Sequence, residues 1–156
     1  MNMPHGKSFT KMSYPLPWNY NDGGAALAGY APNAEDCVCR AFTIATGRPY
    51  SEVRKLILDL AKLERSKTRS TPRGGVSKQT TRKLAIALGM KWVPTMRIGE
   101  GCTTHLRIGE LPETGTIVTQ VTRHVCAIRD GVIQDTHDPS RDGNRCVYGY
   151  WILEEA

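Results

Sequence analysis

Apolar positions recur at helical spacing in the first half of the chain and alternate with polar positions in the second half. The helical pattern predicts three helices, over residues 36–46, 51–64 and 77–88. The second is the clearest, because its apolar side chains form one stripe made of Val53, Leu56, Ile57, Leu60 and Leu63. The N-termini of the three helices can be capped by Asp36, Ser51 and Ser77. The first and third helices are expected to end at Gly47 and Gly89.

The second half of the chain has the pattern of strands. Short strands are predicted at 90–94 and 104–108, followed by a series at 116–122, 124–129, 132–136 and 145–153. Because the helices come first and the strands follow, this order predicts an α+β fold with N-terminal helices packed on a C-terminal antiparallel β-sheet. A chain of 156 residues is long enough to build one such core without disulfides.

Residues 1–35 differ from the rest because prolines and turn formers interrupt any regular pattern. We expect an irregular N-terminal arm there, followed by one folded domain over 36–156. The arm carries large apolar side chains that would lie along the domain or along a neighbouring molecule: Tyr14, Leu16, Trp18, Tyr20 and Leu27. Such an arm offers a contact surface for a neighbouring protein.

Positive charge is concentrated in one segment. Residues 48–83 hold eleven Lys or Arg and three Asp or Glu, a net charge of +8, whereas the whole chain carries +6. A basic segment of this kind suits an acidic protein partner, a nucleic acid or plain solvation. No aromatic residue lies between Tyr50 and Trp92. The stacking platform used for single-stranded nucleic acids is therefore absent, and nucleic-acid binding is the weaker hypothesis.

Composition argues against several other classes of protein. No apolar run reaches the roughly 18 residues that a membrane span needs, and the polar N-terminus lacks the apolar core of a secretory signal. The five cysteines are an odd number at irregular spacing, which predicts free thiols in a reducing compartment. Cys102 and Cys146 are interpreted as structural, and His5 and His105 as surface or structural residues.

A β-hairpin is predicted around Asp130-Gly131, because this dipeptide suits the positive φ angles of a type I′ turn. The expected cross-strand pairs are Arg129–Val132, Ile128–Ile133, Cys126–Asp135 and His124–His137. Side chains alternate across a strand, so His124 and Asp135 are expected on one face within reach of each other. A carboxylate there would fix one imidazole nitrogen and leave the other free to act.

Cys37 is predicted in the first turn of the first helix, where backbone N–H groups and the helix dipole favour the thiolate. An imidazole beside it would complete an activated sulfur nucleophile. Cys39 lies two residues further and points to a different side of the helix, so it is assigned to the core and not to a pair with Cys37.

Other interpretations of these residues stay open. Cys37 is also explained as a small buried side chain, and Asp135 as a cap or turn residue beside the loop that follows it. His137 is expected at a turn or rim, although it could serve as a base in place of His124. A zinc site built from Cys37, Cys126, His124 and His137 is imaginable but lacks any recognised ligand spacing.

Several segments together carry a family resemblance: DCVCRAFTIATGRPYSEV (36–53), LGMKWVP (88–94), GTIVTQVTRHVCAIRDGVIQDT (115–136) and GYW (149–151). A cysteine that begins the first core helix, a histidine that leads a strand and an acidic residue on the next strand resemble the papain-like cysteine peptidase superfamily. More narrowly, the segments resemble a group of small papain-like proteins encoded by tailed phages and prophages. The resemblance extends over roughly residues 35–152.

The resemblance implies a papain-like domain in which Cys37 is the nucleophile, His124 the general base and acid, and Asp135 the orienting residue. It implies a protein or peptide substrate, no metal and no cofactor, and a location in the host cytoplasm or the virion. Papain-like enzymes usually take a second oxyanion donor from a glutamine shortly before the nucleophile, but here no glutamine precedes Gln79. Asn33 is the nearest substitute, with the backbone N–H of Cys37 as the other donor. The alternative is a non-catalytic papain-like module that acts as a phage structural or host-interacting protein.

Overall fold

A computed structural model describes residues 14–31, 34–65 and 69–154 of the chain. The helical elements are η1 (Ala34–Asp36), α2 (Cys37–Thr46), α3 (Tyr50–Ala61) and α4 (Lys78–Ala87). The strands are β1 (Trp18–Tyr20), β2 (Met90–Pro94), β3 (Thr116–Val121), β4 (His124–Arg129), β5 (Val132–Asp135) and β6 (Gly149–Leu153). These elements confirm the predicted α+β class.

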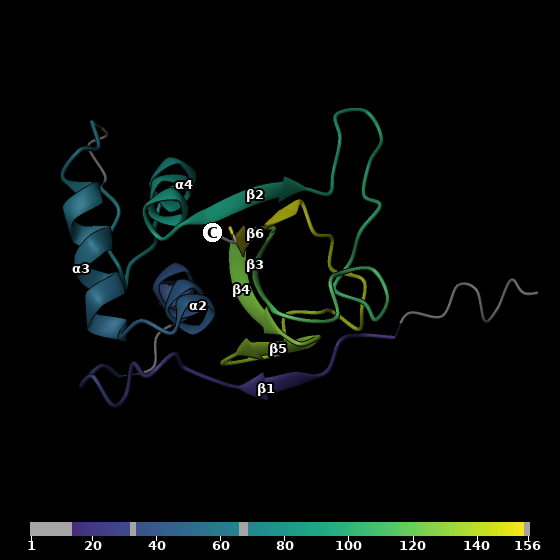
Figure 1. The fold of residues 1–156 in the computed structure, drawn as a ribbon, viewed down its shortest axis with the longest axis horizontal. Coiled ribbons are helices and arrows are strands. Elements are labelled where there is room, and N and C mark those ends of the chain that lie inside the picture. The colour runs from purple at the N-terminus through teal and green to yellow at the C-terminus, as the bar shows by residue number, and fades with distance from the viewer. Residues whose placement is uncertain (1–13, 32–33, 66–68, 155–156) are drawn as a thin grey trace, which may run out of the picture.

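The strands form one curved sheet in the order β1-β5-β4-β3-β6-β2 (Figure 1). All neighbouring pairs are antiparallel except β1 and β5, which run parallel from Trp18–Ile133 to Tyr20–Asp135. The predicted antiparallel sheet is confirmed for the strands β2 to β6, but the parallel strand β1 makes the whole sheet mixed. The prediction of an irregular arm over residues 1–35 was wrong at β1, because this part of the arm supplies an edge strand and buries Leu16 in the core. Residues 1–13 and 32–33 of the arm lie outside the described residues.

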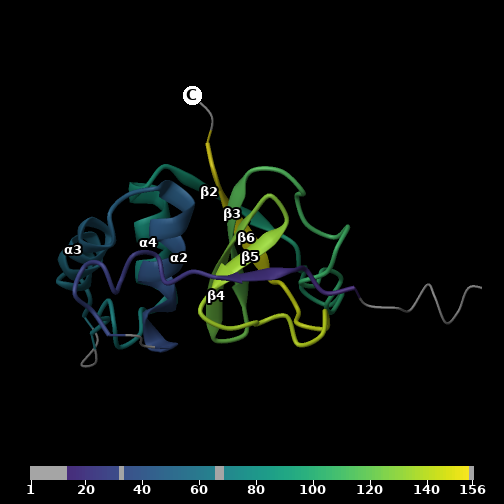
Figure 2. The ribbon, with the colours of Figure 1, turned by 90° about the horizontal axis from the view of Figure 1, so that it is seen from below.

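The sheet separates two apolar clusters. Figures 1 and 2 show the helices on one side of the sheet and the long loops on the other. The cluster on the helical side joins α2, α3 and α4 to the sheet through Phe42, Ile57, Leu84, Val125 and Trp151, among others. The cluster on the loop side includes Leu16, Leu106, Ile128, Ile133 and Val147. Burial on both faces explains why β4 is an almost continuous apolar run.

The helix boundaries agree with the predictions in part. Gly47 ends α2 with a φ of 72°, and the Oγ of Ser77 accepts a hydrogen bond from the N–H of Thr80 at the start of α4, as predicted. Ser51 was wrong as a cap, because α3 begins one residue earlier with Pro49 in the capping position. Leu63 lies beyond the end of α3 and is exposed.

The β4–β5 hairpin has the predicted turn. Asp130 and Gly131 have φ angles of 48° and 78°, which suit a type I′ turn. The pairs Arg129–Val132 and Ile128–Ile133 are confirmed. The ladder between β4 and β5 ends at Ala127–Gln134, so the predicted pairs Cys126–Asp135 and His124–His137 are not part of it. The strand predicted at 104–108 was wrong, because this segment makes only the isolated bridges Pro15–Arg107 and His105–Cys146.

Two of the five cysteines are joined in a disulfide between Cys102 and Cys146, whose Cα atoms lie 6.0 Å apart. The expectation that the cysteines are free thiols was therefore wrong for this pair. It holds for Cys37, Cys39 and Cys126. In the part of the chain that the structure describes, no helix combines the length and apolar character needed to cross a bilayer.

Candidate active site

Cys37 is the first residue of α2 and directly follows the short helix η1. It is partly buried, whereas Val38 and Cys39 beside it are fully in the core. The sequence places it there because the apolar face of α2 packs on β4, which leaves the N-terminal end of the helix at the border of the sheet. A sulfur at this position lies in the positive field of the helix terminus.

His124 and Asp135 meet at the ends of two neighbouring strands. His124 is the first residue of β4 and Asp135 the last residue of β5. The Nε2 atom of His124 lies 2.7 Å from Oδ2 of Asp135, and the two side chains are 9% and 1% exposed. The type I′ turn thus brings the predicted pair together.

Cys37 and His124 line the same cleft and shift each other's pKa toward the charged forms. Burial alone raises the pKa of the Cys37 thiol, but the hydrogen bond and charge of His124 outweigh it and hold that pKa below its ordinary value. Burial lowers the pKa of His124, but hydrogen bonds with Asp135 and Cys37 raise it to about 9. Because Nε2 is occupied by Asp135, Nδ1 is the nitrogen available to the sulfur. A thiolate–imidazolium pair is the activated form of a sulfur nucleophile.

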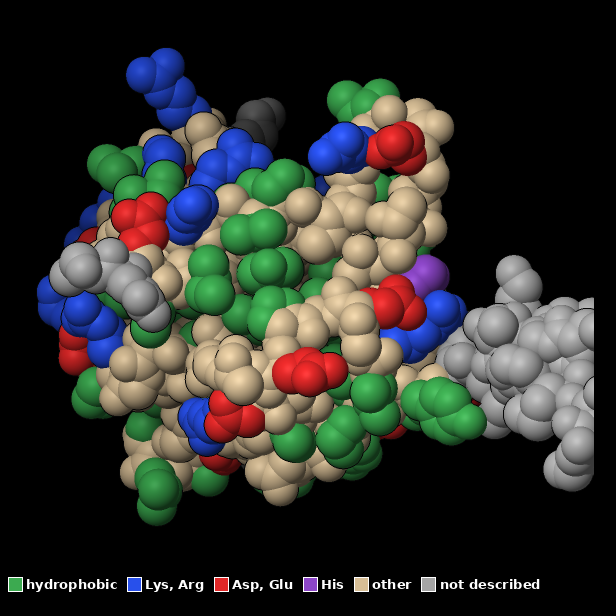
Figure 3. Space-filling view, turned by 45° about the vertical axis from the view of Figure 1, so that its right-hand side comes forward, with side chains coloured by type: hydrophobic (Ala, Val, Ile, Leu, Met, Phe, Trp, Pro, Cys, Tyr) green, Lys and Arg blue, Asp and Glu red, His purple; other side chains and the backbone are tan. Residues whose placement is uncertain are grey.

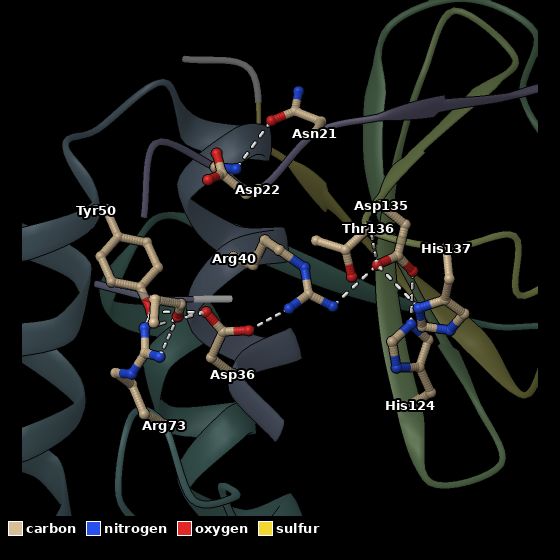
Figure 4. A network of polar contacts seen from close by, with 12 residues as sticks. Asn21, Asp22, Asp36, Arg40, Tyr50, Arg73, His124, Asp135, Thr136 and His137 are labelled. Atoms are coloured by element: carbon tan, nitrogen blue, oxygen red, sulfur yellow. Dashed lines mark hydrogen bonds and ion pairs between the residues drawn. The ribbon is translucent and has the colours of Figure 1, made fainter. Parts of the chain in front are cut away.

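A buried chain of charges continues behind Asp135 into helix α2. Arg40 is 2% exposed and donates from Nη2 to Oδ1 of Asp135 at 2.9 Å and from Nη1 to Asp36. Asp36 in turn accepts a hydrogen bond from the Tyr50 hydroxyl at 2.7 Å. Figure 4 shows the Arg40 guanidinium lying between the two carboxylates. Arg73 lies 3.9 Å from Asp36 and supplies a second cation, so the two carboxylates face two guanidinium groups.

This charge chain was missed in the sequence, and it overturns one prediction. Asp36 precedes α2 but makes no capping hydrogen bond, because its carboxylate turns inward to Arg40 and Tyr50. The available signal was the spacing of four residues between Asp36 and Arg40, with Arg40 set among apolar residues of one helix. The effect on the site is direct: burial raises the pKa of Asp135, but His124 and then Arg40 hold it below its usual range.

Cys39 and Cys126 differ from Cys37 in burial and in the pKa of their thiols. Both are buried, and burial raises the pKa of each thiol to about 12. The assignment of Cys39 to the core is confirmed. Cys126 contacts the hydroxyl of Thr119 at 3.1 Å and belongs to the cluster on the loop side of the sheet.

The described residues contain one group with the geometry of a metal site, formed by His124, Asp135 and His137. The zinc alternative was therefore wrong in its ligand set, because neither Cys37 nor Cys126 belongs to the group. The group fits a cation poorly, since Oδ2 of Asp135 binds His124 and Oδ1 accepts from Arg40 and from the N–H of Thr136. A guanidinium 2.9 Å from the ligand carboxylate would also repel a divalent ion.

His137 lies at the rim of the site, as predicted. Its side chain is 51% exposed, 3.9 Å from Oδ1 of Asp135, and its ring centre is 5.1 Å from that of His124. Burial lowers the pKa of His137, with the His124 charge acting in the same direction against the attraction of Asp135. His124 is thus the histidine that binds Asp135 and lines the cleft together with Cys37.

A cleft of about 330 Å³ opens at the sulfur and is lined by Cys37, Val38, Gln120, Arg123, His124 and Val125, among others. A second cavity of about 250 Å³ is lined by Lys78, Arg82, Trp92, Gln120, Tyr148 and Trp151. Lys78 and Gln120 line both, so the two hollows adjoin. The second owes its aromatic wall to Gly149, where a Cβ would lie 2.2 Å from the Trp92 ring.

The second oxyanion donor is not identified among the described residues. Asn33 lies outside them. Gln120 lines the cleft, but its Nε2 donates to the carbonyl groups of Val121 and His124 and so braces the turn before the histidine. Asn19 and Asn21 donate to the side chain of Gln134.

Comparisons with protein-family profiles, with curated proteins and with solved structures give no match for this chain.

Proposed function

We propose that the protein is a cysteine peptidase or amidase of papain-like type that works through Cys37, His124 and Asp135. The observation that carries the proposal is that His124, whose Nε2 lies 2.7 Å from Oδ2 of Asp135, lines the same cleft as Cys37 and lowers the pKa of its thiol. The sulfur stands at the N-terminus of α2 and lines an open cleft. These are the parts that acyl transfer needs.

In the proposed reaction the Cys37 thiolate attacks the carbonyl carbon of an amide bond. The tetrahedral intermediate collapses as the protonated His124 gives its proton to the leaving amine, which leaves a thioester on Cys37. His124 then takes a proton from water, the hydroxide attacks the thioester, and the acid product leaves with the thiolate restored. Asp135 keeps the imidazole in the required orientation and stabilises its charged form.

The oxyanion of the intermediate needs hydrogen-bond donors beside the sulfur. The backbone N–H of Cys37 and the side chain of Asn33 are the proposed donors. Removing one such donor typically lowers the rate about 100- to 1,000-fold. A loss of this size in an Asn33→Ala variant that still alkylates at Cys37 would support this assignment, and an unchanged rate would exclude it.

The proposed substrate is a protein or peptide that extends from the cleft into the adjoining aromatic hollow. Trp92 and Trp151 form its wall, with ring centres 4.6 Å apart, and Lys78 and Arg82 lie at its border. Figure 3 shows Lys and Arg side chains gathered mainly at the helical end of the molecule. An acidic partner protein that uses the basic segment 48–83 is consistent with this distribution. In this proposal the reaction takes place in the host cytoplasm or in the virion.

The first test is alkylation of the free cysteines with iodoacetamide over pH 5–9, read at each site by mass spectrometry. We expect Cys37 to react well below the ordinary thiol range, while Cys39 and Cys126 in the same chain stay unreactive as internal controls. His124→Ala should return Cys37 to ordinary behaviour. A Cys37 that reacts no faster than a free thiol at any pH would refute the nucleophile.

A second candidate function rests on the edge strand β1. Trp18 and Tyr20 on this strand are 41% and 57% exposed, and within residues 14–31, 34–65 and 69–154 β1 pairs with a strand on only one side. An open edge with aromatic side chains suits contact with a virion or host protein, which is the role of a non-catalytic module. This alternative predicts an unreactive Cys37 and an assembly that is lost when residues 1–30 are removed.

A further inference from the structure

A second cysteine–histidine arrangement lies on the loop side of the sheet, apart from the cleft. Cys102 is exposed and is joined to the half-buried Cys146 just before β6. His105 is bridged to Cys146 through its backbone, and its Nε2 lies 3.5 Å from the Cys102 sulfur. The histidine therefore stands directly at one sulfur of the disulfide.

His105 is held in a fixed orientation by a carboxylate. Its Nδ1 lies 3.0 Å from Oε1 of Glu110, which also accepts from the backbone N–H of His105 at 3.0 Å. Arg107 donates to the other oxygen of Glu110 at 3.2 Å. With Nδ1 bound to the carboxylate, Nε2 is the nitrogen that faces the sulfur.

We propose that Cys102–Cys146 is a thiol–disulfide exchange site in which His105 is the acid–base group of Cys102. The co-reactant is a low-molecular-weight thiol. Its thiolate attacks the Cys146 sulfur and forms a mixed disulfide there. The Cys102–Cys146 bond breaks, and Cys102 leaves as a thiolate that is stabilised by, or protonated from, His105. A second thiol then attacks the mixed disulfide, which yields an oxidised thiol dimer and two reduced cysteines.

Three features together support a role in thiol–disulfide exchange and argue against a purely structural role for this disulfide. Cys146, the sulfur that is attacked, is only half-buried and Cys102 beside it is exposed, so a small thiol has access to the bond. The proton carrier is placed at the sulfur that would leave, and a leaving thiol of lower pKa leaves faster in exchange. A disulfide that only ties two loops together has no need of an oriented imidazole at its sulfur.

The test measures reduction of the full chain by glutathione at pH 7, followed by mass spectrometry after acid quenching. A Cys37→Ala background removes the other reactive thiol and makes the result independent of the proposed peptidase. We expect His105→Gln to slow reduction at least about tenfold. General acid–base catalysis typically contributes about 100-fold or more, but the effect should be smaller here because the site is open to water. Glu110→Gln should slow reduction to a smaller extent. The control is Ile98→Ala, because Ile98 is fully exposed on the same loop and its substitution should leave the reduction rate unchanged.

The direction of the change separates chemistry from structure. If His105 only braces the loop, its removal exposes the disulfide and reduction becomes faster, which would overturn the proposal, as would an unchanged rate. At low conversion the glutathione adduct should be found on Cys146, with Cys102 free for alkylation. An adduct mainly on Cys102 would refute the assigned leaving group.

Discussion

Arg40 and Asp135 form a fully buried ion pair that joins helix α2 to the last residue of β5 at 2.9 Å. The same helix begins with Cys37, and the same carboxylate binds His124. Arg40 therefore fixes the distance between the element that carries the sulfur and the element that orients the imidazole.

Removing Arg40 is expected to cost most of the stability of this region. Arg40→Met leaves Asp36 and Asp135 buried near each other without their shared cation, which should lower the free energy of unfolding by about 3–5 kcal/mol. Urea denaturation at pH 7 gives this value. The matched control is Arg48→Met, because Arg48 pairs with Glu52 in the same chain but both side chains are 46% exposed. Its expected cost is below about 0.5 kcal/mol, and similar costs for the two variants would contradict the analysis.

The Cys37–His124 pair should make stability less dependent on pH than His124 alone would. The pKa of His124 is raised to about 9, so its contribution is complete below the ordinary value near 6.5 and is lost as pH rises toward 9. The lowered pKa of Cys37 has the opposite effect, since its contribution is lost as pH falls. In the wild type the two trends oppose each other.

Cys37→Ala should uncover the His124 trend, because Asp135 still holds the imidazolium. We expect the free energy of unfolding of this variant to fall as pH rises from about 6.5 to 9, more steeply than that of the wild type. Denaturant titrations at half-unit pH steps measure it. Adding His124→Gln should remove the extra slope, and identical slopes in the wild type and Cys37→Ala would show that the pair does not exchange a proton.

Metal ions should have no effect on the candidate site. Zn²⁺ at ten times the protein concentration is expected to leave both the Tm and the Cys37 alkylation rate unchanged, because the Asp135 oxygens are already bound to His124, Arg40 and the N–H of Thr136. Thermal unfolding with Zn²⁺ and with a chelator checks this. A rise in Tm that disappears in His137→Ala would establish a metal site instead.

Gly149→Ala should close the aromatic hollow. The new Cβ would lie 2.2 Å from the Trp92 ring, and Gly149 has no positive φ, so the cost comes from the clash alone. We expect a loss of about 1–3 kcal/mol in the free energy of unfolding and a change in tryptophan fluorescence. Combining it with Trp92→Ala should make the glycine substitution nearly neutral. A clash that persists without the Trp92 ring would point to the backbone.

The sequence predicted the parts of the fold that depend on local chemistry. Asp130-Gly131 determined a turn type and with it the register that brings His124 to Asp135. Gly47 and Ser77 marked helix ends because their effect on the backbone is independent of tertiary context. Cys37 could be placed at a helix N-terminus for the same reason.

The features that were missed depend on long-range contacts. β1 is three residues long between prolines and a turn, and its parallel pairing with β5 leaves no signal in either segment. Arginine is usually a surface residue, and the contact that brings Asp135 to Arg40 joins residues 95 positions apart, which no local spacing indicates. The disulfide joins cysteines separated by 44 residues, and neither spacing nor cysteine count indicated it.

The wide separation of the site residues along the chain has a consequence for biosynthesis. Cys37 and Arg40 leave the ribosome long before His124 and Asp135, and His124 makes the largest contribution to the lowered pKa of the thiol. A nascent chain that lacks β4 and β5 therefore exposes an ordinary cysteine. In the proposed peptidase, the cell would meet the reactive sulfur only after translation has passed β5 and the protein has folded around it.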